Sequence, residues 1–106
     1  MREIETGISI EEIPDNSSIA MDLEGLSVLI CKSNGEVTAV ENRCSHQNKP
    51  LAGGRIRNGY LFCPIHGMRF RLSTGEAMGQ LTTNPIVVIE SAVEAGLIKL
   101  RLSDQQ

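Results

Sequence analysis

The sequence predicts an all-β protein. Turn dipeptides built on glycine recur about every ten residues, a spacing typical of sandwiches and barrels. Several segments between them alternate apolar and polar side chains with period two. No stretch longer than a single turn carries a helical pattern. A chain of 106 residues suits one domain with one modest core, so residues 1–106 are expected to form a single unit.

The turn positions divide the chain into short strands. Asn34-Gly35 supplies the two positive φ angles of a type I′ hairpin. Glu24-Gly25 and Asn58-Gly59 are expected to do the same, and Ala95-Gly96 leads into the final strand. The predicted strands cover residues 18–23, 26–32, 36–40, 55–57, 60–62, 68–72 and 97–102.

Three segments do not fit the strand pattern. Residues 9–13 can form one helical turn before Pro14. Residues 43–54 are polar, carry Pro50 and Gly53-Gly54, and contain a cysteine and a histidine. The second loop, at about residues 63–70, opens with Cys63-Pro-Ile-His-Gly67, which interrupts the strands in the same way. These last two loops contain the candidate functional residues of the chain.

The two loops carry matching ligand motifs. The first reads Cys44-Ser-His46 and the second Cys63-Pro-Ile-His66, with sixteen residues between His46 and Cys63. Both histidines of the chain fall in these motifs. A structural zinc would take all four donors in one tetrahedron, whereas a mixed-ligand [2Fe–2S] cluster divides thiolates and imidazoles between two irons. Zinc sites usually pair like ligands locally, so the mixed motifs favour the cluster.

At this point the sequence resembles the Rieske ferredoxins. Cys44-Ser-His46 followed by Leu51-Ala-Gly-Gly54 is similar to the family's first loop. Cys63-Pro-Ile-His-Gly-Met-Arg-Phe70 and then Leu72-Ser-Thr-Gly-Glu76 are similar to its second loop and the turn that follows. Asn84-Pro85 stands where the family has a third, proline-bearing loop, and an N-terminal strand precedes the hairpins. The likeness therefore covers nearly the whole chain.

The resemblance implies a fold, a cofactor and a ligand set. The fold is a Rieske fold of stacked antiparallel sheets with a small cluster-binding subdomain at one tip. The cofactor is one [2Fe–2S] cluster. Cys44 and Cys63 are expected to bind the inner iron, and His46 and His66 the outer, solvent-facing iron.

The resemblance also predicts a low reduction potential. Lys49 and Ile65 stand where respiratory and photosynthetic members carry a disulfide. Met68 and Phe70 stand where those members have a serine and a tyrosine that donate hydrogen bonds to the cluster. Hydrogen bonds to cluster sulfur stabilise the reduced state, so their loss lowers the potential.

The expected function is electron transfer rather than catalysis. The resemblance implies the ferredoxin component of a ring-hydroxylating dioxygenase, which passes one electron from an NAD(P)H-dependent flavoprotein reductase to a terminal oxygenase. Two alternatives stay open: the Rieske-like small subunit of an assimilatory nitrite reductase, and a zinc-stabilised binding module.

Composition and charge limit the expected partners and the expected location of the protein in the cell. The net charge of −3 and pI near 5.3 do not suit a nucleic-acid partner, and neither a membrane-spanning run nor a signal peptide is evident. A cytoplasmic monomer is expected, with Cys31 as a buried core residue. Between Asn42 and Gly75 there is no acidic residue, so a positive collar around the loops is a further expectation, its members being Arg43, Lys49, Arg55, Arg57, Arg69 and Arg71.

Overall fold

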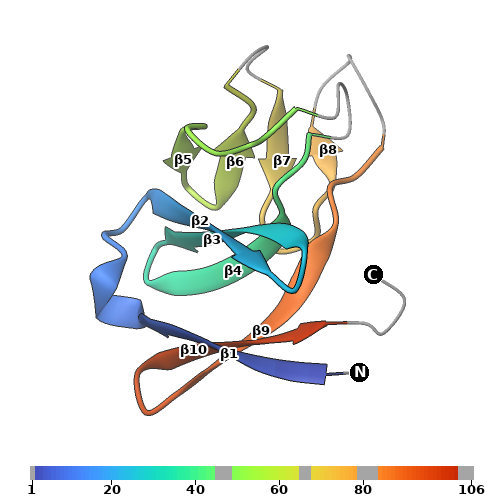
Figure 1. The fold of residues 1–106 in the computed structure, drawn as a ribbon. Helices are drawn as coiled ribbons and strands as arrows, with labels where there is room; N and C mark the ends of the chain where they lie inside the picture. Colours follow the sequence, from blue (N-terminus) through green and yellow to red (C-terminus); the bar gives the residue numbers. More distant parts are fainter. Residues whose placement is uncertain (1, 45–48, 65–67, 79–83, 103–106) are drawn as a thin grey trace.

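The protein is all-β, as the sequence predicts. The computed structural model describes residues 2–44, 49–64, 68–78 and 84–102. Its strands are β1 (Arg2–Ser9), β2 (Ser17–Leu23), β3 (Leu26–Ser33), β4 (Glu36–Glu41), β5 (Ile56–Arg57), β6 (Tyr60–Phe62), β7 (Arg69–Arg71), β8 (Ala77–Met78), β9 (Val88–Glu94) and β10 (Leu97–Leu102), as labelled in Figure 1. A short 3₁₀ helix, η1 (Ile10–Glu12), is the only helix in the described part of the chain. No helix there is long and apolar enough to cross a membrane.

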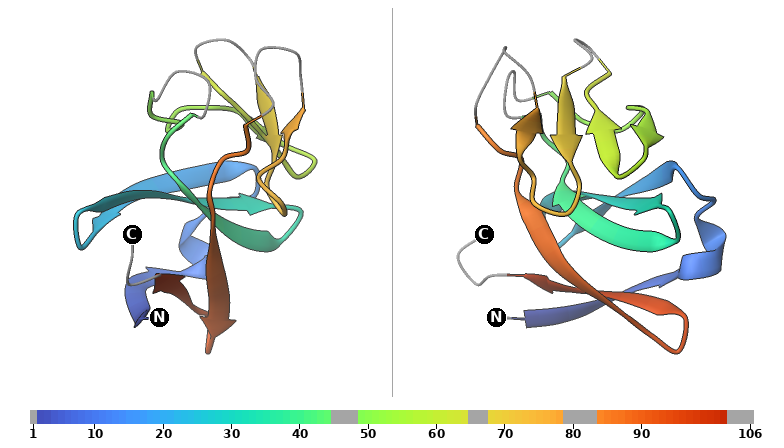
Figure 2. Two further views of the ribbon diagram at one scale, coloured as in Figure 1. Left: turned by 90° about the vertical axis from the view of Figure 1, so that its right-hand side faces the viewer. Right: turned by 180° about the vertical axis from the view of Figure 1, so that it is seen from behind.

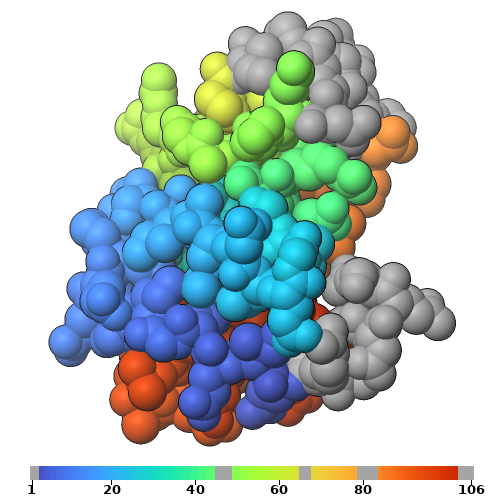
Figure 3. Space-filling view, in the orientation of Figure 1, coloured from blue at the N-terminus to red at the C-terminus, as the bar shows by residue number. Residues whose placement is uncertain are grey.

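A six-stranded antiparallel sheet forms the larger part of the molecule. Its strand order is β1-β10-β9-β4-β3-β2. The β1-β10-β9 half and the β2-β3-β4 half fold toward each other, with the long strand β9 passing from one to the other (Figures 1 and 2). One hydrophobic cluster is drawn from both halves, its buried members being Ile13, Leu23, Val28, Ile30, Ala39, Ile89, Ile98, Leu100 and Leu102. In Figure 3, β2 and β3 lie across the middle of the front, with β1 below them and the strands that carry the loops above.

A four-stranded antiparallel sheet, in the order β5-β6-β7-β8, forms the second part. It is inserted between β4 and β9, which pair directly through Ala39 with Ile89 and Val40 with Val88. A second hydrophobic cluster joins this sheet to the first, because Leu29 and Val40 pack in the same cluster as Leu61, Phe70 and other buried residues. The expected stacked sheets with a small subdomain at one end are therefore confirmed.

The predicted turns follow their residue types. Asn34 and Gly35 have φ angles of 54° and 79°, and Asn58 and Gly59 have 51° and 81°. Asparagine tolerates this left-handed region and glycine meets no steric penalty there, so both dipeptides close tight hairpins. The helical turn is also present: the Ser9 hydroxyl accepts from the N–H of Glu11, and Glu12 accepts from the N–H of Ser9.

Two strands have no counterpart among the predicted segments. The strand β9 was not predicted, although it is a central strand of the larger sheet. Its second half is largely exposed, so Glu90 and Glu94 break the apolar alternation that marks a strand in sequence. The two-residue strand β8 is too short for any periodic signal.

Candidate metal centre

The first cysteine-bearing loop is fixed by backbone and amide hydrogen bonds. Cys44 is completely buried, and its N–H donates to the carbonyl of Lys49 at 2.7 Å. The amide oxygen of Asn42 accepts from the N–H groups of Leu51 at 2.8 Å and Ala52 at 3.0 Å. Asn42 therefore ties the far side of the loop back to the end of β4. Sequence reasoning missed this role, although an asparagine directly after a strand is a known loop-fixing residue type.

Asn42 is itself held by strand β3. Its N–H donates to the carbonyl of Ser27 at 2.9 Å, and its side-chain amide donates to the Ser27 hydroxyl at 3.1 Å. The first loop is thus anchored to the larger sheet at one residue. A side chain with both an acceptor and a donor is needed, because the oxygen serves the loop while the nitrogen serves the strand.

The second cysteine-bearing loop is closed in the same manner as the first. The N–H of Cys63 donates to the carbonyl of Met68 at 2.6 Å, five residues further along the chain. This bond directly continues the pairing of β6 with β7, whose last partners on this side are Phe62 and Arg69. The loop therefore stands at the end of a hairpin, and its cysteine is 3% exposed.

The two loops touch each other at Gly54. A Cβ atom at this position would collide with the carbonyl oxygen of Phe62 and lie 3.0 Å from that of Leu51. The N–H of Gly54 also donates to the Leu51 carbonyl at 3.0 Å. Only glycine allows the first loop to lie this close to the strand that leads into Cys63.

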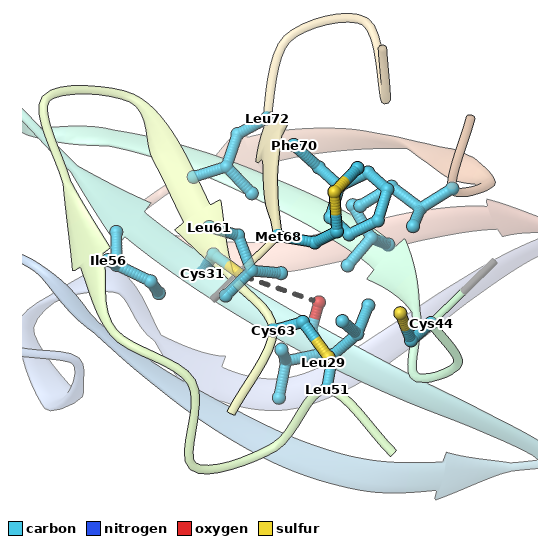
Figure 4. Packing of buried hydrophobic residues seen from close by; sticks show 12 residues of the cluster. Leu29, Cys31, Cys44, Leu51, Ile56, Leu61, Cys63, Met68, Phe70 and Leu72 are labelled. Carbon is cyan, nitrogen blue, oxygen red and sulfur yellow. Dashed lines mark hydrogen bonds between the residues drawn. The ribbon is translucent and has the colours of Figure 1, made fainter. Parts of the chain in front are cut away.

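The fold brings the two cysteines into one hydrophobic cluster. Cys44 and Cys63 pack with Leu51, Met68 and Phe70, all of them buried, and Figure 4 shows these side chains in close-up. Such an apolar shell limits solvent access to a metal centre and so influences its potential. A cleft of about 470 Å³ opens beside Cys63, lined also by Gly53, Arg55, Phe62 and Pro64.

The histidine predictions, His46 and His66, fall on residues 45–48 and 65–67, outside the described part of the chain. Within the described residues, no group of three or more cysteine, histidine or acidic side chains is arranged so that it could hold a metal ion. The donor chemistry that is described fits a [2Fe–2S] cluster. Two buried thiols on separate loops can supply soft thiolate ligands to an iron–sulfur centre, and metal binding compensates for placing thiolates in an apolar environment.

The third cysteine has a different environment. Cys31 lies on strand β3 and is completely buried, which confirms the expectation of a core residue. Its thiol lies 3.9 Å from the Leu29 carbonyl, drawn as a dashed line in Figure 4. Burial raises the pKa of this thiol to about 12. A thiol that stays protonated is a poor metal ligand and a poor nucleophile.

The basic residues of the expected collar are spread over two regions. Arg43 and Lys49 are exposed and flank the first loop, and Arg43 lies 3.4 Å from Glu41. Arg55 lines the cleft beside Cys63. The others, Arg57, Arg69 and Arg71, lie along the four-stranded sheet.

A small all-β fold that buries two cysteine-bearing loops in one group of apolar side chains suits an iron–sulfur protein. Residues 7–90 match the Rieske [2Fe-2S] domain, and the chain belongs to that family. It carries one Rieske [2Fe–2S] cluster, as the family does.

Similar proteins indicate which kind of Rieske protein this chain resembles. The 3-phenylpropionate/cinnamic acid dioxygenase ferredoxin subunit of Photorhabdus laumondii is 30% identical over 92% of this chain and 93% of its own length. The ferredoxin component of the naphthalene 1,2-dioxygenase system of Pseudomonas aeruginosa is 26% identical over 91% of this chain and 92% of its own. Like these relatives, the chain is an electron-transfer ferredoxin and not itself a catalytic enzyme.

Solved structures show the same fold. The ferredoxin of carbazole 1,9a-dioxygenase from Nocardioides aromaticivorans IC177 superposes with a TM-score of 0.86 at 22% identity, covering 94% of this chain and 97% of that one. A chain from the complex of reduced oxygenase and oxidized ferredoxin in carbazole 1,9a-dioxygenase has a TM-score of 0.85 at 20% identity, covering 92% of this chain and 91% of that one. A nitrite reductase small subunit has a TM-score of 0.78 at 13% identity, covering 96% and 100%.

Proposed function

We propose that this chain holds its cluster through Cys44, His46, Cys63 and His66. The two cysteines would bind one iron and the two histidines the other, the division that defines Rieske centres. This proposal rests on one observation: Cys44 and Cys63 come from two separate loops and are buried in the same group of hydrophobic side chains. The bound cluster accepts and releases one electron at a time. The protein residues hold it, exclude water from its thiolate side and set its electrostatic environment.

The proposed potential lies at the low end of the Rieske range, which spans about −150 to +300 mV. Met68 is 5% exposed and Phe70 is fully buried in the same cluster as both cysteines. Neither side chain has a hydrogen-bond donor, so neither can stabilise added electron density on cluster sulfur. Lys49 and Ile65 cannot form the disulfide found in high-potential members.

In the proposed reaction sequence, the chain receives one electron from an NAD(P)H-dependent flavoprotein reductase and delivers it to the terminal oxygenase of a ring-hydroxylating system. The relatives named as dioxygenase ferredoxins support the oxygenase step. We propose that residues 1–106 form a single domain, because the hydrophobic cluster around the cysteines includes residues of both sheets. A cytoplasmic monomer with neither a nucleic-acid nor a membrane partner completes the proposal.

The test is spectroscopic and then kinetic. The purified protein should contain two irons and two sulfides per chain, as a [2Fe–2S] cluster requires. Its electron paramagnetic resonance spectrum after dithionite reduction should be of the Rieske type. The reduced protein should then be reoxidised by a ring-hydroxylating oxygenase. A colourless zinc protein, or a spectrum of the all-cysteine ferredoxin type, would contradict the ligand proposal.

A second candidate is the small subunit of an assimilatory nitrite reductase. The fold alone supports it, since that structure is only 13% identical to this chain. The dioxygenase ferredoxin of Photorhabdus laumondii is 30% identical, which favours the oxygenase system. Reduction of nitrite by a reconstituted reductase that depends on this chain would reverse the preference.

A further inference from the structure

The four-stranded sheet has two chemically different faces. Strand pairing places Arg57 opposite Tyr60 and Tyr60 opposite Arg71. The next row pairs Phe62 with Arg69. Because directly opposed residues share a face of the sheet, these side chains all project to one side.

The opposite side of the sheet carries the residues between them. Ile56, Leu61 and Phe70 are buried in the core cluster, so the side that carries the arginines faces outward. The right-hand view of Figure 2 shows β5, β6, β7 and β8 side by side with no other strand drawn in front of them. We call this surface the arginine face and define it by Arg55, Arg57, Tyr60, Phe62, Arg69 and Arg71.

The arginine face is positive on a chain that is negative as a whole. From Arg55 to Met78 the sequence has four arginines and one acidic residue, Glu76. The formal charge of this segment is therefore +3, whereas the whole chain has −3. Among the described residues, no carboxylate lies within ion-pair distance of Arg55, Arg57 or Arg69.

Glu76 neutralises Arg71 incompletely. The Glu76 carboxylate is 4.0 Å from the Arg71 Nε, at the limit of an ion pair. That Nε is buried and makes no hydrogen bond within the described residues. The Arg71 side chain as a whole is 43% exposed, so its guanidinium charge still acts on the solvent outside the sheet.

Tyr60 orders two of the arginines. The Cζ atoms of Arg69 and Arg71 lie 5.3 Å and 5.9 Å from the centroid of its ring, within the range of a cation–π contact. A guanidinium that rests on a ring loses less side-chain entropy when it binds a carboxylate, and its planar fork suits two parallel hydrogen bonds. The surface is therefore preorganised for acidic groups.

The arginine face is continuous with the second cysteine-bearing loop. Strand β6 leads directly from Tyr60 through Phe62 into Cys63. Strand β7 starts at Arg69, one residue after the carbonyl that accepts the Cys63 N–H. A protein that lies on this face is thereby beside the proposed metal centre, where electron transfer requires it.

We propose that the arginine face docks an acidic patch on the terminal oxygenase. This inference rests on the proposed function, in which the oxygenase is the partner that the similar proteins name, and it adds the surface and the partner chemistry. Opposite charges on two surfaces mainly increase the association rate and orient the encounter. The carboxylates of the oxygenase would pair with the guanidinium groups while the adjacent cysteine loop faces the acceptor.

The experiment compares two charge reversals with the same effect on net charge. Arg69→Glu lies on the arginine face, whereas Arg101→Glu lies on strand β10 of the larger sheet, where Arg101 pairs with Glu3 and Glu90. The probe is the terminal oxygenase purified from the organism that makes this chain. Each ferredoxin is reduced with dithionite, freed of excess reductant and mixed with oxygenase in a stopped-flow instrument, so that no reductase is needed.

We expect Arg69→Glu to lower the second-order rate constant of electron transfer about tenfold or more at low salt, the scale of electrostatic steering. Arg101→Glu should stay close to wild type. The difference should shrink between about 0.05 and 0.5 M salt, because screening shortens the range of the field. Glu76→Gln, which removes the acidic group of the face, should raise the rate constant at low salt.

The two proposals fail in different ways. If the wild-type protein does not reduce the oxygenase at all, the proposed function is wrong. If it does, but Arg69→Glu and Arg101→Glu behave alike, only the docking inference is wrong. The docking inference is equally wrong if Arg69→Glu slows reduction by the flavoprotein reductase and leaves the oxygenase step unchanged. Unchanged electron paramagnetic resonance and midpoint potential in both variants show that the cluster itself is intact.

Discussion

Cys63 and Met68 close the second loop through a single backbone hydrogen bond of 2.6 Å, from the N–H of one to the carbonyl of the other. Cys44 and Lys49 do the same for the first loop at 2.7 Å. In each loop the cysteine is five residues from its acceptor, and each histidine motif lies within the closed segment in sequence. The two loops of the proposed site are therefore closed by the same kind of backbone hydrogen bond.

The first prediction follows from the role of Lys49. Its carbonyl closes the loop, whereas its side chain is exposed, so Lys49→Glu should leave the cluster content unchanged. Because the charge lies beside the site, electron transfer to the partner should nevertheless slow, and the defect should diminish as salt rises. Iron and sulfide analysis checks the first statement and stopped-flow mixing the second. Turnover with wild-type salt dependence would remove Lys49 from any docking role.

The second prediction concerns ligation. His46→Cys or His66→Cys should give a cluster with an all-thiolate optical spectrum, or no cluster, because the imidazoles define the Rieske spectrum. Cys31→Ala is the matched control: this buried thiol, whose pKa is raised to about 12, should be dispensable for the cluster. A Rieske spectrum that survives either histidine change would show that the ligand assignment is wrong.

The third prediction concerns the reduction potential. Phe70 is buried in the same group of hydrophobic side chains as Cys44 and Cys63. Phe70→Tyr places a hydroxyl donor there, and because such a donor stabilises the reduced iron–sulfur cluster, the midpoint potential should rise. Phe62→Tyr adds the same group on the outward side of the sheet and should change the potential little. Protein-film voltammetry measures both. A potential that is unchanged or lower in Phe70→Tyr would contradict the explanation given for low potential.

The fourth prediction tests the contact between the loops. Gly54→Ala puts a methyl group into the Phe62 carbonyl and should destabilise the protein by about 1–3 kcal/mol, the usual cost of overpacking. It should also reduce the iron content, since it separates the two cysteine-bearing loops. Gly53→Asn is the control for added bulk: a Cβ there meets no atom within 4 Å, so only the backbone strain of a φ of +89° remains, which is smaller for asparagine than for most side chains. Equal losses in the two variants would argue against the contact.

The fifth prediction concerns pH and the outer face of the larger sheet. A hydrogen bond from Lys99 at 2.7 Å lowers the pKa of Glu94 below its ordinary value of 4.5. The same bond raises the pKa of Lys99 above 10.5. The lowered carboxyl pKa stabilises the fold above pH 4.5 and the stabilisation is lost as pH falls through the folded-state pKa. The raised lysine pKa stabilises it below pH 10.5 and is lost at higher pH.

Lys99→Met should therefore lower the unfolding temperature at neutral pH and converge with wild type in acid. The effect should be small, because Glu94 is exposed and the Lys99 side chain is still 20% exposed, and ion pairs in contact with solvent contribute little. Scanning calorimetry of the two proteins at pH 7 and at a pH well below the ordinary carboxyl pKa of 4.5 provides the comparison. A difference of the same size at both values would mean that the ion pair is not its cause.

The sequence predicted the hairpins well because their turns are specified locally. A dipeptide such as Asn58-Gly59 determines its own backbone angles, whatever lies elsewhere in the chain. Strand β9 was not predicted because its position depends on pairing with β4 across a long insertion, and its exposed second half has little apolar periodicity. A single sequence contains little information about which distant segments pair with each other, so such strands are hard to predict from it.

The same difference between local and distant contacts separates the site residues that were predicted from those that were not. The cysteine and histidine motifs are local and scarce, so they were found directly. Asn42 and Gly54 were not assigned roles, because each acts through a contact with a distant residue: Ser27 on β3 for the first and Phe62 on β6 for the second. The arginine face also required the strand register, since residues 55–57 and 69–71 meet only across β6.

The small sheet is inserted into the larger sheet between two strands that pair directly, β4 and β9. The N–H of Glu41 donates to the carbonyl of Val87 at 2.8 Å, so the chain leaves the larger sheet and returns to it at nearly one point. The entropy of closing that long loop is lost whether or not the segment binds metal, and it grows only slowly with length. Leu29 and Val40 of the larger sheet are buried against the inserted segment, so the two sheets depend on each other for stability. Exposed residues of the inserted loops, such as Lys49 and Ala52, lie outside this shared core, so their identity can vary, and the potential with it, while the pairing of the larger sheet is kept.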